Sequence, residues 1–152
     1  MNKLDDETLL KFATESNKIE RIYVERRHLQ HAAALKKLLA LEELRLEDLQ
    51  EFVTSIQPDA RLRTASYHRV WIGGREAPPA SESLPALMGL LDNINKGLVS
   101  PLEAHKQYEY LHPFIDGNGR SGRAIWLWQQ AKQGYDGRYL FLQMYYYSTL
   151  VS

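Results

Sequence analysis

The most informative stretch of the sequence is HPFIDGNGRSGR, residues 112–123. Pro113 disfavours helical backbone at the residue before it, so a preceding helix is expected to end at His112. The run Asp-Gly-Asn-Gly at positions 116–119 is typical of a tight turn, because glycine and asparagine tolerate positive φ angles. A second helix is expected to begin near Asn118. The stretch therefore predicts a sharp corner between two helices.

This corner has the composition of an anion site. Backbone N–H groups at the start of a helix have no partners within it, and the helix dipole adds about half a positive charge there. Arg120 and Arg123 are three residues apart, so both guanidinium groups lie on one face of the helix, suited to phosphate oxygens. Asp116 supplies the oxygen ligand that Mg²⁺ takes beside phosphates, and His112 is the nearby group able to accept a hydroxyl proton near neutral pH. The residues alone indicate phosphoryl or nucleotidyl transfer and leave open which phosphorus is attacked.

Apolar residues recur at steps of three and four along much of the chain, which is typical of helices with one buried face. This spacing predicts helices over residues 46–56 and 84–94, and the stretch 32–41, rich in alanine and leucine, predicts another. The apolar positions are Leu46, Leu49, Phe52, Val53 and Ile56 in the first helix, and Leu84, Leu87, Met88, Leu91 and Ile94 in the second.

Other signals place the ends of the later helices. Ser100, Pro101 and Glu103 have the order of an N-cap, a first-turn proline and a capping box, so a helix is expected to run from there to the corner. The helix after the corner is expected to end at Gly134, and the tyrosine-rich tail 139–150 to form the last helix.

One segment departs from helical periodicity. Residues 62–76 combine aromatic and β-branched side chains with Gly73-Gly74, which predicts a short β-hairpin. The fold class is therefore all-α: a compact helical bundle with one small β-hairpin.

The composition narrows the classes of function. Lysine plus arginine and aspartate plus glutamate both number 19, so the basic excess of a typical nucleic-acid-binding protein is missing. The sequence has no cysteine, which excludes disulfides, thiol catalysis and cysteine-ligated zinc. The first residues are acidic where a signal peptide is apolar, and no apolar run approaches the ~20 residues of a membrane span. We expect one cytoplasmic, soluble domain over residues 1–152, with no nucleic-acid or membrane partner.

Residues 112–123 resemble the signature of the Fic family, His-x-Phe-x-Asp/Glu-Gly-Asn-Gly-Arg-x-x-Arg, at every fixed position. Residues 104–105 and 108–109 are similar to the helix that precedes this signature, and the resemblance covers roughly residues 14–130. It implies the Fic fold. The stretch similar to the family's flap is Arg69-Val70-Trp71-Ile72-Gly73-Gly74.

The resemblance implies a protein adenylyltransferase, which transfers AMP from ATP to a Ser, Thr or Tyr hydroxyl of a target protein. By matching position, His112 would be the general base, and Asp116 would hold Mg²⁺ between the α- and β-phosphates. Arg120 would contact the β-phosphate and Arg123 the γ-phosphate, while the flap would pair with an extended segment of the target. The residues implied to line the anion hole are Gly117, Asn118 and Gly119, and Phe114 would be buried as an anchor of the loop.

Relatives within the family leave alternatives open. The Doc-type kinases have lysine in place of the second motif glycine and transfer the γ-phosphate. Gly119 stands at that position here, which favours AMP transfer, although another nucleotide donor remains open. A third alternative is a regulatory module that binds nucleotide without turnover, against which the presence of His112 argues.

The run SNKIER that begins at Ser16 resembles the family's inhibitory pattern, Ser/Thr-x-x-x-Glu-Gly/Asn, in the class that carries it before the core. The resemblance implies that residues 6–21 form an inhibitory helix. Glu20, one helical turn after the serine, would neutralise Arg123 and deprive the γ-phosphate of its partner. Arg21 departs from the pattern, which has glycine or asparagine there.

The remaining histidines and the aromatic clusters are expected to be structural. No catalytic role is predicted for His28, His31, His68 or His105. The residues Trp126, Trp128 and 145–147 are expected to pack in the core or between copies of the chain, so a homo-oligomer is left open.

Overall fold

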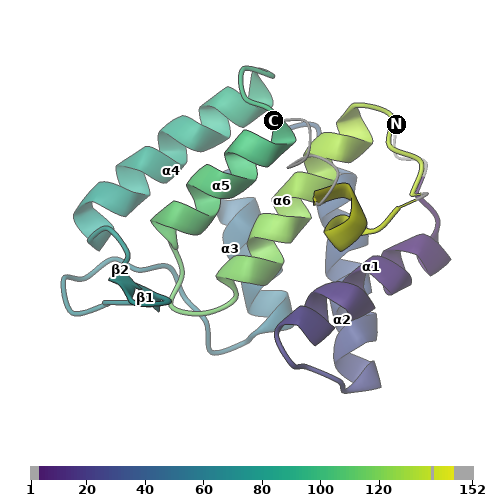
Figure 1. Cartoon of the computed structure of the whole chain (residues 1–152), viewed down its shortest axis with the longest axis horizontal. Helices are drawn as coiled ribbons and strands as arrows, with labels where there is room; N and C mark the ends of the chain where they lie inside the picture. Colours follow the sequence, from purple (N-terminus) through teal and green to yellow (C-terminus); the bar gives the residue numbers. More distant parts are fainter. Residues whose placement is uncertain (1–3, 138, 146–152) are drawn as a thin grey trace.

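The computed structural model describes residues 4–137 and 139–145. Over these ranges the protein is mostly helical with one two-stranded antiparallel hairpin, as predicted (Figure 1). The helices are α1 (Asp6–Ile19), α2 (Glu25–Leu39), α3 (Leu46–Ile56), α4 (Ala80–Asn95), α5 (Pro101–Leu111) and α6 (Asn118–Lys132). The strands are β1 (Trp71–Ile72) and β2 (Arg75–Glu76). A further helical segment covers residues 141–145, and the rest of the predicted tail helix lies outside the described residues.

Helix α6 is the centre of the bundle. It contacts α1, α2, α3 and α5, while α4, α5 and α6 lie side by side (Figure 1). Eleven of its fifteen residues are buried, so it lacks the polar face of a surface helix. The corner predicted to bind anions is the first turn of this helix, and the core therefore holds it in place.

The predicted apolar positions of α3 and α4 are buried, apart from Leu46 and Leu84, which are partly buried, and Met88. Met88 is 50% exposed, whereas Leu90, which was not predicted, is buried. The inward face of α4 is formed by positions 87, 90, 91 and 94, the i, i+3, i+4, i+7 set, and Met88 lies to one side of it.

The helix starts follow local signals, except in α2. Ser100 Oγ accepts a hydrogen bond of 3.1 Å from the backbone N–H of Glu103, and Pro101 is the first residue of α5, as predicted. The Glu103 carboxylate accepts from Gln107 at 3.4 Å instead of completing a capping box. Helix α2 begins at Glu25, well before the predicted residue 32. The earlier start was missed because the first turns are rich in polar residues and lack a clear apolar period.

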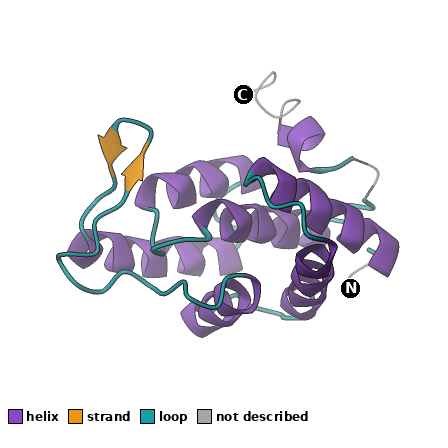
Figure 2. Ribbon diagram, turned by 90° about the horizontal axis from the view of Figure 1, so that it is seen from below, coloured by secondary structure: helices purple, strands orange, loops and turns teal. Residues whose placement is uncertain are grey.

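The β-hairpin stands clear of the helices at one end of the bundle (Figure 2). Trp71 pairs with Glu76 and Ile72 with Arg75, and the turn contains Gly73 with a φ of 61°. This agrees with the predicted hairpin and its glycine turn. None of the helices in the described ranges is both long and apolar enough to cross a membrane.

The chain just before the hairpin pairs with the corner. Residues 61–63 run antiparallel to residues 113–115, with a bridge between Leu62 and Phe114 and backbone hydrogen bonds of 2.9 Å on either side. The segment that leads to the hairpin and the segment that leads to α6 are therefore held together.

Candidate functional site

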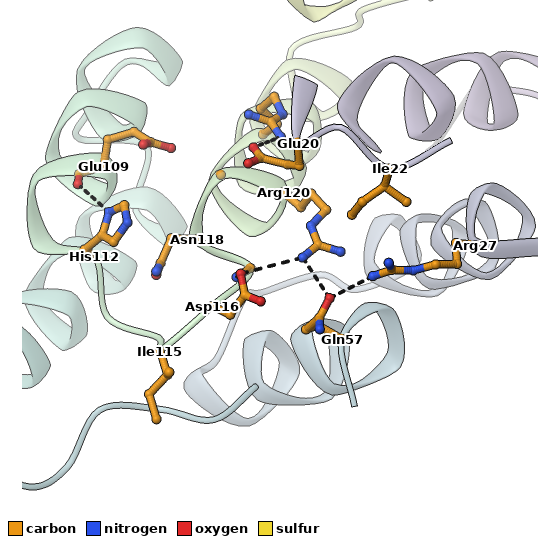
Figure 3. A pocket seen from close by; sticks show the side chains of 13 residues that line it. Glu20, Ile22, Arg27, Gln57, Glu109, His112, Ile115, Asp116, Asn118 and Arg120 are labelled. Atoms are coloured by element: carbon orange, nitrogen blue, oxygen red, sulfur yellow. Dashed lines mark hydrogen bonds and ion pairs between the residues drawn. The ribbon is translucent and has the colours of Figure 1, made fainter. Parts of the chain in front are cut away.

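A cavity of about 460 Å³ lies over the N-terminus of α6 (Figure 3). Small-molecule sites commonly measure about 300–1,000 Å³. Every residue predicted to bind phosphate, hold metal or act as the base lines this cavity, and so does Glu20. The lining residues are Glu20, Ile22, Arg27, Gln57, Glu109, His112, Ile115, Asp116, Gly117, Asn118, Gly119, Arg120 and Arg123.

Two residues with left-handed backbone shape the corner. His112, directly after α5, has φ 47° and ψ 61°, and Gly117, directly before α6, has φ 83°. A glycine adopts this conformation without penalty, whereas a residue with a side chain pays about 1–3 kcal/mol. The strained residue is His112, the predicted base, and strained backbone is common at active sites.

Three backbone amides at the start of α6 are free. Within the described residues, nothing accepts from the N–H groups of Asn118, Gly119 and Arg120. The Gly117 N–H, by contrast, donates to Asp116 Oδ1 at 2.7 Å. The amides without a partner are therefore those of residues 118–120, and Gly117, Asn118 and Gly119, which were predicted to line the anion hole, all line the cavity.

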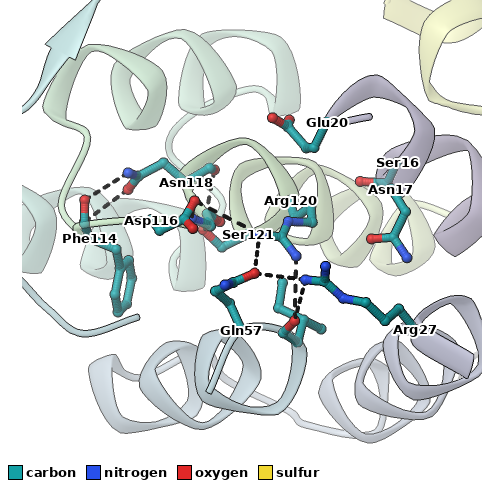
Figure 4. A network of polar contacts seen from close by, with 12 residues as sticks. Ser16, Asn17, Glu20, Arg27, Gln57, Phe114, Asp116, Asn118, Arg120 and Ser121 are labelled. Carbon is teal, nitrogen blue, oxygen red and sulfur yellow. Dashed lines mark hydrogen bonds and ion pairs between the residues drawn. The ribbon is translucent and has the colours of Figure 1, made fainter. Parts of the chain in front are cut away.

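The Asn118 side chain braces the loop. Its Oδ1 accepts from the Phe114 N–H at 2.9 Å, and its Nδ2 donates to the Phe114 carbonyl at 2.8 Å (Figure 4). Phe114 is buried, as predicted. One N–H of the amide group is engaged in this brace, and the backbone N–H of Asn118 has no partner in the described residues.

The His112 imidazole has a defined tautomer. Its Nδ1 lies 3.1 Å from the Glu109 carbonyl, which can only accept, so Nδ1 carries the proton and Nε2 keeps its lone pair. Burial lowers the pKa of His112 from its usual 6.5. The ring is therefore neutral at pH 7, which a general base requires.

Asp116 is the one predicted metal ligand. Its carboxylate is 59% exposed and lies 3.9 Å from Arg120 Nη2. The described residues contain no group of three His, Asp or Glu side chains able to hold a metal by themselves. A single exposed carboxylate still fits Mg²⁺, which takes its other ligands from water and phosphate oxygens.

Arg123 is held by the end of α1. Its Nε donates to Ser16 Oγ at 2.8 Å, and its Nη2 donates to the Ser16 carbonyl at 3.0 Å and to Glu20 Oε2 at 2.6 Å. A Cβ atom at Gly119 would collide with the Glu20 carboxylate, so a larger residue at that position would require the Glu20 side chain to shift. The structure thus brings together Ser16, Glu20 and Arg123, which are far apart in sequence.

The end of α1 is a Schellman motif, in which the helix closes through a left-handed residue. The N–H of Ile22 donates to the Asn17 carbonyl at 2.9 Å, and the N–H of Arg21 donates to the Lys18 carbonyl at 3.0 Å. Arg21 has a φ of 61°, which explains why glycine or asparagine suits this position. The helix itself ends at Ile19, two residues before the predicted boundary.

Replacing Arg21 with glycine is expected to stabilise the protein by about 0.5–1 kcal/mol, because the left-handed strain of the folded state is relieved. This figure is a net gain, since glycine also gives the unfolded chain more conformational freedom, which opposes folding. For a chain of this size the melting temperature should rise by roughly 2–4 °C per kcal/mol in thermal unfolding. Arg21→Ala is the control, since alanine removes the side chain but keeps the Cβ. Equal melting temperatures for the two variants would contradict the strain at this residue.

A buried polar triad that the sequence did not predict holds α1 against α2. Asn17 Nδ2 lies 2.9 Å from His28 Nδ1, and Asn17 Oδ1 lies 2.8 Å from His31 Nδ1. Burial lowers the pKa of His31 to about 3, so this ring stays neutral. The triad fixes the helix end that carries Ser16 and Glu20. The i, i+3 spacing of the two histidines was the available signal.

Arg63 is a second unpredicted residue. It is 1% exposed and donates to four carbonyl groups, those of His68, Pro78, Leu111 and His112, at 2.7–3.2 Å. Two of these carbonyls end α5 and two flank the hairpin. Arg63 therefore fixes His112 and the hairpin relative to each other, and nothing local in the sequence distinguishes it from a surface arginine.

The predicted flap is an exposed hairpin with its own internal contacts. Arg69 makes two hydrogen bonds of 2.7 and 2.8 Å to the Glu76 carboxylate, and its guanidinium lies 5.0 Å from the Trp71 ring centroid. Trp71 is 54% exposed. Arg69, one of the predicted docking residues, therefore makes its contacts within the hairpin itself.

The other aromatic and histidine predictions concern packing. His105 is buried with its Nδ1 3.4 Å from the Gly122 carbonyl and does not line the cavity. Trp126 and Trp128 are 1% and 4% exposed, which assigns both to the core. Tyr145 packs on the core, and residues 146–147 lie outside the described part of the chain.

Comparisons with known proteins show the family and the fold. The sequence model of the Fic/DOC family matches residues 31–129. The fold is similar to that of a Fic domain containing signaling protein from Bacteroides thetaiotaomicron, with a TM-score of 0.70 and 18% identity, over 96% of this chain and 70% of that one. It is also similar to a Fic family protein from Desulfovibrio desulfuricans, with a TM-score of 0.52 and 22% identity, over 85% of this chain and 45% of that one. At these identities the likeness shows the fold, and this chain spans less than half of the second protein.

Proposed function

The chain belongs to the Fic/DOC family, and from this membership and its anion corner we propose that it transfers AMP from ATP to a hydroxyl side chain of a target protein. The observation that carries the proposal is that the His112 imidazole and the free amides of residues 118–120 line one cavity. This places a base beside a site for phosphate, which is what nucleotidyl transfer to a hydroxyl requires.

In the proposed reaction the amides of residues 118–120 bind the α-phosphate, and Arg120 binds the next phosphate. His112 Nε2 takes the proton of the target hydroxyl as its oxygen attacks the α-phosphorus, the bond to the bridging oxygen breaks, and pyrophosphate leaves. The amides stabilise the charge that develops on the α-phosphate oxygens. Mg²⁺ held by Asp116 would neutralise charge on the phosphates.

We propose in addition that Glu20 acts as a brake. It pairs with Arg123, the residue that would hold the γ-phosphate, so ATP would bind in an unproductive position. The hairpin residues 69–74 would receive an extended segment of the target by strand addition, which suits a hairpin that stands clear of the helices (Figure 2).

The rate of AMP transfer is expected to depend on pH through His112. The base acts only when neutral, and burial lowers its pKa below 6.5, so activity should persist at pH 6.5 and fall at lower pH as the ring gains a proton. Initial rates of the Glu20→Gly protein over roughly pH 5–8 measure this acid limb. A half-maximal rate at or above pH 6.5 would contradict it.

Mass spectrometry of a lysate tests the proposed function. Expression of the Glu20→Gly protein should leave peptides that carry one added AMP on a Ser, Thr or Tyr. Expression of the Glu20→Gly, His112→Ala protein should leave none. Adducts of phosphate alone in the first lysate, or no adducts, would reject AMP transfer.

A further inference from the structure

A third arginine faces the cavity, and it does not belong to the Fic signature (Figure 3). Arg27 lies in the first turn of α2, and its Nη2 donates to Gln57 Oε1 at 2.7 Å and to the Ile56 carbonyl at 3.3 Å. Both acceptors are neutral. Among the described residues, no carboxylate lies within ion-pair distance of Arg27. The guanidinium is therefore fixed in position but not neutralised.

Arg120 meets Arg27 at the same glutamine. Its Nη2 donates to Gln57 Oε1 at 3.2 Å, so two guanidinium groups converge on one neutral oxygen (Figure 4). The Arg120 side chain is 4% exposed, its Nε has no partner in the described part of the chain, and Asp116 lies 3.9 Å away. Two neighbouring cations with so little opposing charge, one of them with an unused buried donor, form a site that an anion would stabilise.

The contacts of Arg123 indicate which path a bound phosphate chain would take through the cavity. Its Nε and Nη2 are already engaged by Ser16 and Glu20, so a phosphate chain that starts at the amides of α6 meets a neutralised arginine along that helix. On the α2 side of the same cavity it meets Arg120, which has a single ion pair in the described residues, to Asp116 at 3.9 Å, and Arg27, which has none there.

We propose that Arg27 is a second receptor for the terminal phosphate of ATP, used while Glu20 holds Arg123. This inference rests on the proposed nucleotide site. The triphosphate then runs from the α6 amides past Arg120 towards α2, and the inhibited protein binds ATP through contacts that the active form does not need.

Binding of α,β-methylene ATP and α,β-methylene ADP, measured by isothermal titration calorimetry, tests the proposal without turnover. Arg27→Gln should weaken triphosphate binding about tenfold, the effect of losing one charge-assisted hydrogen bond, and diphosphate binding less than about threefold. Arg26→Gln is the matched control, since Arg26 is an exposed neighbour, and should change neither. Arg27→Lys keeps the charge and should lie between the wild type and Arg27→Gln.

The Glu20→Gly background supplies the second arm. There Arg123 is free, so Arg27→Gln should weaken triphosphate binding by less than about threefold. An equal loss for both nucleotides would show that Arg27 only supports α3, and an equal loss in both backgrounds, or none, would also overturn the proposal. Failure of the proposed function is separate: triphosphate binding that depends on Arg27, without AMP transfer, rejects the transferase but not this receptor.

Discussion

Replacing Glu20 with glycine is expected to raise the rate of AMP transfer by about 5- to 150-fold, the range of a coupling of about 1–3 kcal/mol. The Glu20 carboxylate, on a side chain that is 37% exposed, lies 2.6 Å from Nη2 of the buried Arg123, so its removal frees the guanidinium for the γ-phosphate. ATP can then lie along α6 with its α-phosphorus near His112. Incorporation of label from α-labelled ATP into target protein measures the rate.

Two controls separate the brake from general loosening of the structure. Glu43→Gly removes an exposed loop glutamate that pairs with Arg45 at 3.9 Å, and it should leave the rate unchanged. Glu20→Gln keeps the shape of the side chain but not its charge and should give an intermediate rate. Equal rates for the wild type and the Glu20→Gly protein would remove the brake from this account.

Replacing His112 with asparagine in the Glu20→Gly protein is expected to lower the rate about 10²- to 10⁴-fold, the usual contribution of a general base. Asparagine tolerates the left-handed backbone at this position, where φ is 47°, so the corner should keep its shape. The variant lacks a group that can accept the hydroxyl proton. Single-turnover labelling with saturating ATP isolates the chemical step.

The affinity for nucleotide distinguishes a base from a binding residue. If His112 acts on the proton alone, the asparagine variant should bind α,β-methylene ATP within about threefold of its parent, because the phosphate contacts come from α6. A rate loss of less than about tenfold, or a parallel loss of affinity, would contradict the role given to His112.

Local signals in the sequence predicted most of the fold and the centre of the site. Pro113 and the glycine-rich turn located the corner, and the apolar spacing located α3 and α4, because these features act over a few residues. The signature also placed all its polar residues around one cavity. Met88 was wrongly placed in the core because two faces of α4 fit the apolar spacing and tertiary packing selected one.

Long-range contacts could not be predicted in the same way. Asn17 meets two histidines on α2, Arg63 meets carbonyls at the end of α5 and beside the hairpin, and Arg27 meets Gln57, the residue after α3. Each is a polar residue whose role depends on which segment packs opposite it, and the residues next to it in the sequence do not indicate that partner. Arg21 is the opposite case. Its left-handed backbone is a local feature, but it could not be predicted from the sequence because arginine stands where glycine or asparagine would have indicated it.

The source of the transferred group tests the central claim most directly. The Glu20→Gly protein is incubated with a lysate and ATP labelled either at the α- or at the γ-phosphate. This account predicts protein-bound label from the α-position that is lost with His112→Asn, and γ-label no higher than the lysate gives with the His112→Asn protein. γ-label that depends on His112 would identify a kinase, and label from neither position above that control would identify a protein that binds nucleotide without transfer; either result would contradict the account.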